Sequence, residues 1–194
     1  PFTPVRSTEG VRGSLAMPHG LNDPWHLTPM STPLDYLAAV RRVLDHLEQT
    51  QLPAIERAAD LVVGALARRG AVWCAEIGHG IQGDFINRAG GLAAVQLFHC
   101  QLTITDRVAR ALKDRPQPEP VERDLETVRL AVRASNLRAD DVLVLGSVSG
   151  RNRGPVELAL ACRDKGVHTI GLTSLAYTRA VTSAHPSGKK LADV

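Results

Sequence analysis

The chain has 194 residues and a net charge of +3, and 44% of its residues are hydrophobic but only 4% aromatic. This is typical of one domain with a core of Ala, Leu and Val, and no apolar run is long enough to span a membrane. Lys and Arg are interleaved with Asp and Glu, and few rings are present to stack on bases, which disfavours nucleic-acid binding.

The first 32 residues differ from the rest of the chain. Residues 1–32 are rich in Pro, Gly, Ser and Thr and show no sustained periodicity. Such a composition is typical of a segment that does not pack into a core. We therefore expect a flexible leader or a remnant of cloning at 1–32, and the main domain at 33–194.

Two helical runs open the main domain. In the first, which starts at Pro33, apolar residues recur every three or four positions and predict an amphipathic helix. These residues are Leu37, Val40, Leu44 and Leu47. The second run starts at Pro53 and ends at Gly70. We expect the two runs to form a helical hairpin, on which an oligomer is built.

Short apolar runs alternate with helical stretches along the rest of the chain. The predicted strands are 71–77, 92–98, 141–147 and 168–174. The predicted helices are 82–89, 121–135 and 154–166. Neighbouring parallel strands need a crossover of a dozen residues or more, which this spacing supplies. The pattern predicts an α/β fold, an open parallel sheet with helices on both faces, which binds ligands outside the carboxyl ends of its strands.

The turn after the strand at 141–147 is the first candidate site. Its polar residues are Ser147, Ser149, Gly150, Arg151 and Asn152. Backbone amides at a helix N-terminus, joined by serine hydroxyls, suit a phosphate group, and Gly150 allows an unusual backbone angle. The alternative is that Ser149 or Asn152 only caps the following helix.

A glycine-rich loop follows the strand at 71–77. Its sequence, "EIGHGIQG", has glycines at 78, 80 and 83 and matches the GxGxxG pattern of nucleotide-binding folds. That pattern calls for an acidic residue about 20 residues later, which "LAAVQLFHC" does not provide. A Rossmann-like, NAD-binding protein is therefore a rival interpretation rather than the preferred one.

Two longer motifs carry a resemblance to a known family. "NRAGGLAAV" (87–95) and "TSLAYTRAVTSAHPSGKKL" (173–191) resemble motifs of the SIS (sugar isomerase) domain family, in particular its bacterial group with RAGG and HPSGK. The resemblance runs from about Leu34 to the last residue. It implies about five parallel strands, a homodimer or homotetramer, and a sugar phosphate as ligand.

The resemblance also assigns residues to the ligand. It implies that Ser147, Ser149 and Gly150 hold the phosphate, with Asn152 next to them. It further implies that Thr173 and Ser174 form a second polar edge of the same pocket. The family continues into a further strand and helix, which this sequence lacks after residue 194.

The glycine-rich loop departs from the family pattern. Glu76 stands at the first glycine, and Gly80 stands where the family has a serine. A carboxylate would repel a phosphate. Glu76 must therefore point away, pair with Arg88 or another cation, or indicate a different ligand.

Isomerisation of a sugar phosphate requires an acid and a base. The candidates near the predicted mouth of the sheet are His79, Asp84 and His185. Each has a structural alternative: a backbone hydrogen bond for His79, the helix dipole for Asp84, and a surface turn for His185. The alternative function is a non-catalytic sensor of sugar phosphate, and a purely structural role is the third possibility.

The cysteines and histidines show no metal-binding pattern. Cys74, Cys100 and Cys162 lack CxxC or CxH spacing, and the seven histidines form no HxH or HxxxH pair. We expect reduced thiols in a cytoplasmic protein, with Cys74 and Cys162 in the core rather than acting as nucleophiles. No metal and no cofactor are expected.

Overall fold

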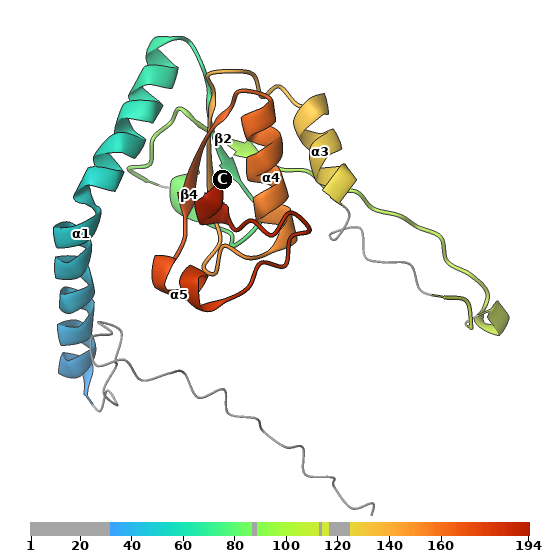
Figure 1. The fold of residues 1–194 in the computed structure, drawn as a ribbon, viewed down its shortest axis with the longest axis horizontal. Coiled ribbons are helices and arrows are strands. Elements are labelled where there is room, and N and C mark those ends of the chain that lie inside the picture. Colours follow the sequence, from blue (N-terminus) through green and yellow to red (C-terminus); the bar gives the residue numbers. More distant parts are fainter. Residues whose placement is uncertain (1–31, 87–88, 113, 117–124) are drawn as a thin grey trace, which may run out of the picture. The chain divides into compact units, whose positions relative to one another are not determined.

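The computed structural model describes residues 32–86, 89–112, 114–116 and 125–194 (Figure 1). The chain divides into two compact units, residues 1–52 and 53–194, which are described separately. Of the predicted leader, residues 1–32, only Thr32 is described. The segment for which we expected a flexible leader therefore lies outside the described residues.

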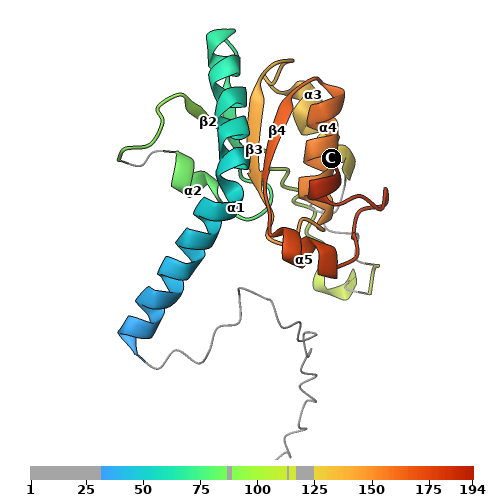
Figure 2. The ribbon, with the colours of Figure 1, turned by 60° about the vertical axis from the view of Figure 1, so that its left-hand side comes forward.

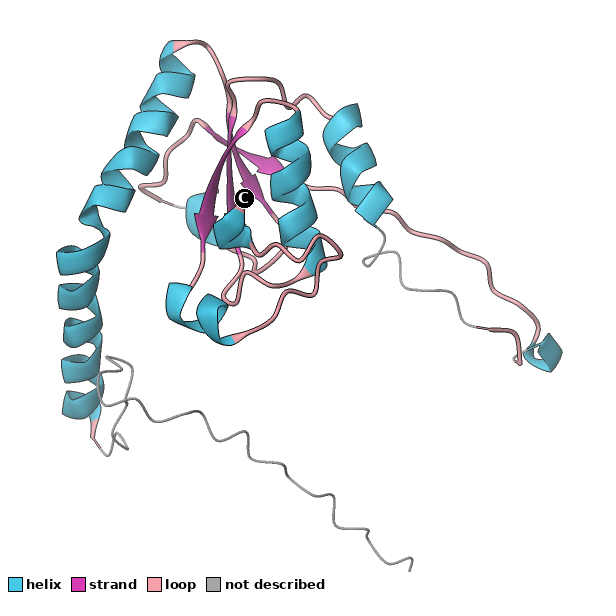
Figure 3. Ribbon diagram, viewed as in Figure 1, coloured by secondary structure: helices cyan, strands magenta, loops and turns pink. Residues whose placement is uncertain are grey.

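The second unit contains a parallel sheet of four strands in the order β2-β1-β3-β4 (Figure 3). The strands are β1 (Val72–Ala75), β2 (Val95–Phe98), β3 (Val142–Gly146) and β4 (His168–Leu172). The helices are α2 (Gln82–Phe85), α3 (Leu125–Ala134), α4 (Arg153–Asp164) and α5 (Leu175–Ala180), with 3-10 turns at Arg110–Leu112 and Leu191–Asp193. This confirms the predicted α/β fold, although the described residues hold four strands where the resemblance implied about five.

Helices cover both faces of the sheet, as predicted (Figure 2). β3 is buried at every residue, and its side chains alternate between the two faces. Leu143 and Leu145 pack with α3 and α4. Val142 and Val144 pack with α2 and the C-terminal half of the first helix. Because β3 lies inside the sheet and is covered on both faces, its sequence is a continuous apolar run.

The first helix, α1, corrects the predicted hairpin. It runs without a break over Pro33–Ala67, and Pro53 lies inside it. Proline removes one backbone hydrogen bond, but no glycine or turn-forming pair lies between the two helical runs to reverse the chain. The helical hairpin was therefore the wrong prediction, because a proline alone does not make a turn.

A buried carboxylate fixes the amino-terminal edge of the sheet. Oδ1 of Asp141 accepts a hydrogen bond from the Ala71 amide at 2.8 Å. Its Oδ2 accepts bonds from the Trp73 indole and the Arg138 amide, both at 3.1 Å. These contacts join the start of β1 to the start of β3, and so hold the carboxyl ends of the two strands side by side.

At the carboxyl edge, the glycine-rich loop after β1 lies directly on the end of β3. Gly78 has φ of 117°, and a Cβ atom there would lie 2.3 Å from the carbonyl oxygen of Gly146. A side chain on Gly146 would in turn meet Ile81. Both glycines are needed for this close approach, which brings the loop and the predicted phosphate turn together.

This contact predicts a difference between two glycine substitutions. Gly78→Ala forces a side chain into a backbone oxygen at a positive φ, so we expect it to lower the free energy of unfolding by about 2 kcal/mol or more. Gly83→Ala is the control, because a Cβ at Gly83 meets nothing within 4 Å. Urea denaturation of the 194-residue chain measures both. Equal effects would contradict the packing described.

Candidate functional site

The turn that follows β3 holds a buried serine without a hydrogen-bond partner. Ser147 is 1% exposed, and its amide donates to the carbonyl oxygen of Leu172 at 2.9 Å. Its hydroxyl oxygen is buried and has no hydrogen-bond partner among the residues that the structure describes. Buried polar atoms are nearly always paired, so an unpaired one at a predicted ligand site is informative.

The backbone of this turn presents donors. The Gly150 amide donates to the Ser147 carbonyl oxygen at 3.1 Å, which closes a tight turn, and Gly150 has φ of 62°. The amides of Ser149, Arg151 and Asn152 find no acceptor among the described residues. They precede the 12-residue helix α4, whose N-terminus carries a partial positive charge.

The capping alternative does not describe this turn. Asn152 is the N-cap residue of α4, but its side chain makes no capping hydrogen bond. Ser149 lies three residues before the cap and is buried. The side chains predicted to cap the helix are therefore not used for that purpose.

Thr173 and Ser174 brace the turn from the side of β4. The Thr173 hydroxyl donates to the Val148 carbonyl oxygen at 3.2 Å, and the Ser174 amide donates to the same oxygen at 2.9 Å. The Ser174 hydroxyl accepts a bond from the Tyr177 amide and caps α5. Thr178, which the sequence did not single out, donates to the Ser149 carbonyl oxygen at 3.0 Å.

His79 reaches the turn from the glycine-rich loop. Its amide donates to the Gly146 carbonyl oxygen at 2.9 Å, and its Nδ1 accepts a bond from the Val148 amide at 3.3 Å. A neutral imidazole that accepts at Nδ1 carries its proton on Nε2. His79 is therefore held as a hydrogen-bond donor at the edge of the turn.

Gln82 occupies space beside the glycine that replaces the family serine. Its side-chain oxygen Oε1 is buried and, like the Ser147 hydroxyl, has no hydrogen-bond partner in the described part of the chain. A Cβ on Gly80 would lie 3.2 Å from this oxygen, so a serine there would crowd the carboxamide. The sequence showed that Gly80 replaces a serine of the family pattern. It did not indicate that the Gln82 side chain lies in the space beside this glycine.

Asp84 lies on the exposed side of α2. Burial raises the pKa of the Cys74 thiol, and the negative charge of Asp84 raises it further, so the carboxylate lies near β1. The NAD-binding alternative also loses support here, because α2 has only four residues and a Cβ at Gly83 would meet no neighbour. The dinucleotide pattern needs close helix–strand packing at that glycine.

The predicted catalytic residue His185 is buried, at 7% exposure. Its Nε2 contacts Oε2 of Glu157 at 2.6 Å, and its Nδ1 contacts the Ser187 hydroxyl at 2.7 Å. Nδ1 also accepts the Ser187 amide at 3.1 Å. Both ring nitrogens are engaged, so in this structure His185 serves the loop rather than an open site.

The C-terminal loop is nevertheless attached to the turn. The Ala184 amide donates to the Arg151 carbonyl oxygen at 3.0 Å, and the Leu191 amide donates to that of Gly150 at 2.8 Å. Lys190 caps the end of α5 through the carbonyl oxygen of Thr178. These bonds place the basic HPSGKK loop next to the turn.

Beneath the loop, Glu157 is fully buried and bonded on both sides. Burial on its own raises the pKa of Glu157, but hydrogen bonds from Arg129 and His185 outweigh it and lower this pKa below its ordinary value of 4.5. Arg129 bonds one carboxylate oxygen and His185 the other. The ionised carboxylate therefore holds the C-terminal loop to α4.

Glu76 contacts a histidine just after the neighbouring strand, and not a cation such as the sequence alternatives named. The partner is His99, whose Nδ1 contacts Oε2 of Glu76. Arg88, the partner named from the sequence, lies outside the described residues. Glu76 follows β1 and His99 follows β2, so the pair lies at the carboxyl edge of the sheet.

The cysteines are free thiols, and Cys74 and Cys162 lie in the core as predicted. Burial raises the pKa of Cys162 to about 12, which keeps it protonated.

Within the described ranges, no three His, Cys, Asp or Glu side chains lie close enough to share a metal ion. None of the described helices is both long and apolar enough to cross a membrane.

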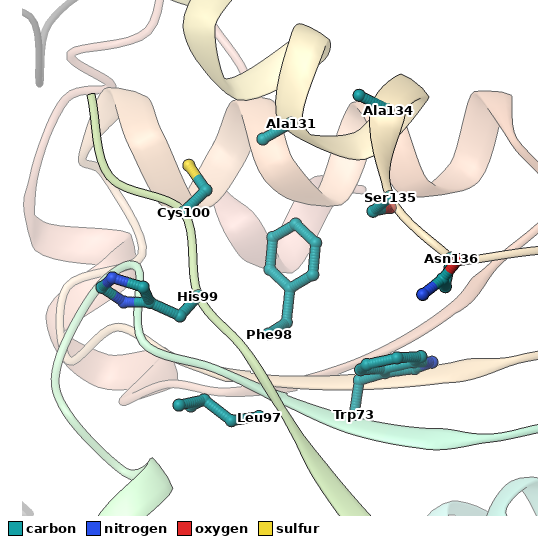
Figure 4. A pocket seen from close by; sticks show the side chains of 9 residues that line it. All are labelled: Trp73, Leu97, Phe98, His99, Cys100, Ala131, Ala134, Ser135 and Asn136. Atoms are coloured by element: carbon teal, nitrogen blue, oxygen red, sulfur yellow. The ribbon is translucent and has the colours of Figure 1, made fainter.

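A groove of about 330 Å³ lies between the β1–β2 edge and α3 (Figure 4). Its lining residues are Trp73, Leu97, Phe98, His99, Cys100, Ala131, Ala134, Ser135 and Asn136. His99 and Cys100 lie at one end, and Trp73 and Asn136 at the other. The groove shares no residue with the turn after β3.

The lowered pKa of Glu157 predicts a pH dependence of stability. Its ionised form adds stability that is present above pH 4.5 and is lost as pH falls through the lower, folded-state pKa. We expect Glu157→Gln to cost about 2–3 kcal/mol at pH 7 and clearly less at pH 3. Urea denaturation at both pH values measures this, with the exposed Glu126→Gln as control. An equal cost at both values would contradict the ionised pair.

Comparisons with known proteins agree with this geometry. A family model, the SIS domain, matches residues 35–174. The UPF0309 protein of Halalkalibacterium halodurans is 34% identical over 160 residues, which cover 81% of this chain and 63% of that protein. The UPF0309 protein of Streptomyces coelicolor is also 34% identical, with 81% and 62% covered. The chain thus spans less than two thirds of the length of these curated relatives.

One solved structure shares the fold. Phosphoheptose isomerase GmhA from Neisseria gonorrhoeae superimposes with a TM-score of 0.54 at 21% sequence identity, over 75% of each chain. At this identity the likeness concerns the fold alone. Together with the family match over most of the chain, these observations show that the chain belongs to the SIS domain family.

Proposed function

We propose that this protein binds a sugar phosphate, with the phosphate group on the turn of residues 147–152. The observation that carries the proposal is the buried Ser147 hydroxyl without a partner, next to amides that find no acceptor. An unsatisfied buried group costs about 1–3 kcal/mol, which a phosphate oxygen would recover. Family membership and the GmhA fold point to the same class of ligand.

Charges around the turn support an anionic ligand. Arg151 and Lys189 form no ion pair within the described part of the chain. Arg153 donates to the Ala184 carbonyl oxygen at 3.1 Å and so also stays near the turn. Because Ile81 packs over Gly146, beside the covered Ser147, the proposal requires the glycine-rich loop to move when the ligand enters.

The sugar would lie against the glycine-rich loop. His79 offers a proton on Nε2, which suits a carbonyl oxygen or a hydroxyl group of the sugar. The unpaired Gln82 Oε1 suits a hydroxyl or amide donor, as in an amino sugar. With a base nearby, this arrangement favours an aldose–ketose isomerase, in which His79 polarises the carbonyl group.

The second candidate is a non-catalytic sensor of sugar phosphate. It is favoured by the burial of His185, whose Nε2 contacts Oε2 of Glu157 and is therefore not open to a ligand. We assign His185 the role of holding the C-terminal loop rather than of proton transfer. The two candidates differ in turnover and not in the ligand.

The binding proposal is tested by thermal shift with glucose 6-phosphate, glucosamine 6-phosphate, ribose 5-phosphate and sedoheptulose 7-phosphate. A phosphorylated ligand at 100 times its Kd should stabilise the protein by about 2.7 kcal/mol, and its unphosphorylated form should not. We expect Ser147→Ala to lose this gain while its own stability stays equal or rises by up to about 1 kcal/mol.

Ser135→Ala is the control, because the Ser135 hydroxyl donates a hydrogen bond to the Val132 carbonyl oxygen at the end of α3, away from the turn. It should keep the full ligand-induced shift. If Ser147→Ala also keeps it, the phosphate does not bind at the turn. If no sugar phosphate stabilises the intact protein, the proposed function fails.

We also propose that the first unit pairs with a second copy of the chain. Leu37, Leu44 and Leu47 form an exposed apolar stripe on α1, which a monomer would leave in water. We expect a homo-oligomer in solution that dissociates in the double variant Leu44→Lys, Leu47→Lys. Light scattering during size-exclusion chromatography measures this, with Arg42→Ala on the opposite helix face as control. A monomeric native protein would contradict the pairing.

A further inference from the structure

We propose that Glu76 and His99 form the proton-transfer pair of the site, with His99 as the catalytic base and Glu76 as the residue that positions it. The inference rests on the proposed sugar phosphate ligand and adds the base that an isomerase needs. Neither residue was a catalytic candidate from the sequence.

The sheet itself brings the pair together. β1 and β2 are in register from Val72↔Val95 to Ala75↔Phe98, so Glu76 and His99 are the next pair along the same ladder. The Glu76 amide continues this ladder by donating to the Phe98 carbonyl oxygen at 3.2 Å. Both side chains thus start from a fixed backbone, as a proton-transfer pair requires.

The hydrogen bond between them sets the tautomer of the histidine. A carboxylate can only accept, so Nδ1 of His99 donates its proton to Oε2 of Glu76. In the neutral ring the lone pair then lies on Nε2, as in the acid–histidine pairs of hydrolases. Nε2 of His99 has no partner among the described residues, and the side chain is 47% exposed. Nε2 of His99 can therefore accept a proton from a ligand.

The order of the strands sets the separation between this pair and the proposed phosphate turn. β1 separates β3 from β2, and two strand spacings amount to about 10 Å. An extended sugar phosphate of five or six carbons covers about 6–8 Å from phosphorus to its second carbon, at about 1.5 Å per bond. A phosphate on the turn after β3 would therefore direct the reacting carbons past His79, on the loop after β1, toward His99.

The chemistry balances within the substrate. In the aldose-to-ketose direction, Nε2 of His99 takes the proton on C2, and the electron pair of that bond forms the C1=C2 bond of an enediol. The carbonyl oxygen on C1 takes a proton from Nε2 of His79, which regains one from the C2 hydroxyl. His99 then returns its proton to C1. C1 is reduced and C2 oxidised by two electrons, so no outside oxidant is required.

This role accounts for the departure at Glu76. A carboxylate in the first loop conflicts with a phosphate nearby, but Glu76 is bonded to the neighbouring strand and not to the turn. Its negative charge instead stabilises the imidazolium that forms when His99 takes a proton. The Glu76 carboxylate would repel a phosphate bound at this position, but it makes His99 a better proton acceptor.

The test uses two separate measurements on the 194-residue chain and the sugar phosphate panel. Thermal shift reports binding, and NMR in D₂O reports exchange of the C2 proton together with aldose–ketose conversion. We expect His99→Gln to keep binding within about twofold and to lower exchange and kcat by 100-fold or more. Glu76→Gln should lower kcat by about tenfold with KM unchanged, and Glu76→Asp should restore part of the loss.

His168→Gln is the control, because His168 is an exposed histidine at the start of β4, on the opposite edge of the sheet. It should leave both measurements unchanged. Native exchange in His99→Gln, or binding without any exchange in the native protein, overturns the proton-transfer pair but leaves the proposed ligand in place. Absence of binding by the native protein overturns both.

Discussion

The close contact between the glycine-rich loop and the end of β3 is the constraint on which the site depends. Gly78 approaches the carbonyl oxygen of Gly146 so closely that a Cβ atom cannot be accommodated. The same loop then bonds His79 to Gly146 and to Val148. Without this approach, the turn of residues 147–152 would lie apart from the glycine-rich loop. The site is thus made by two strand ends that the sheet places side by side.

A second set of contacts holds the turn from the other side. The C-terminal loop bonds the carbonyl oxygens of Gly150 and Arg151, and Glu157 anchors that loop through His185. Because Glu157 is fully buried and also bonded to Arg129, the anchor is part of the core. The backbone carbonyls of the turn are therefore occupied while several of its amides are not. That asymmetry suits an anion, which accepts hydrogen bonds and donates few.

Local sequence patterns predicted the elements well, because strand length, apolar runs and helix periodicity are local properties. The four strands, the turn after β3 and the burial of Cys162 follow from them. Features that depend on strand register or on packing could not be predicted from local sequence patterns. The pair of Glu76 and His99 requires the alignment of β1 with β2, and the burial of His185 requires Glu157 below it. The continuous helix through Pro53 shows that a proline without turn residues does not reverse a chain.

A phosphate on the turn after β3 would accept hydrogen bonds from the backbone amides of that turn. Amide NMR spectra recorded during titration with a stabilising sugar phosphate report on these bonds. We expect the amide protons of Ser149, Arg151 and Asn152 to move downfield with saturation, and the unphosphorylated sugar to leave them in place. If the ligand binds while these three signals stay fixed and the changes gather around Trp73 and Phe98 instead, the phosphate does not bind at the turn.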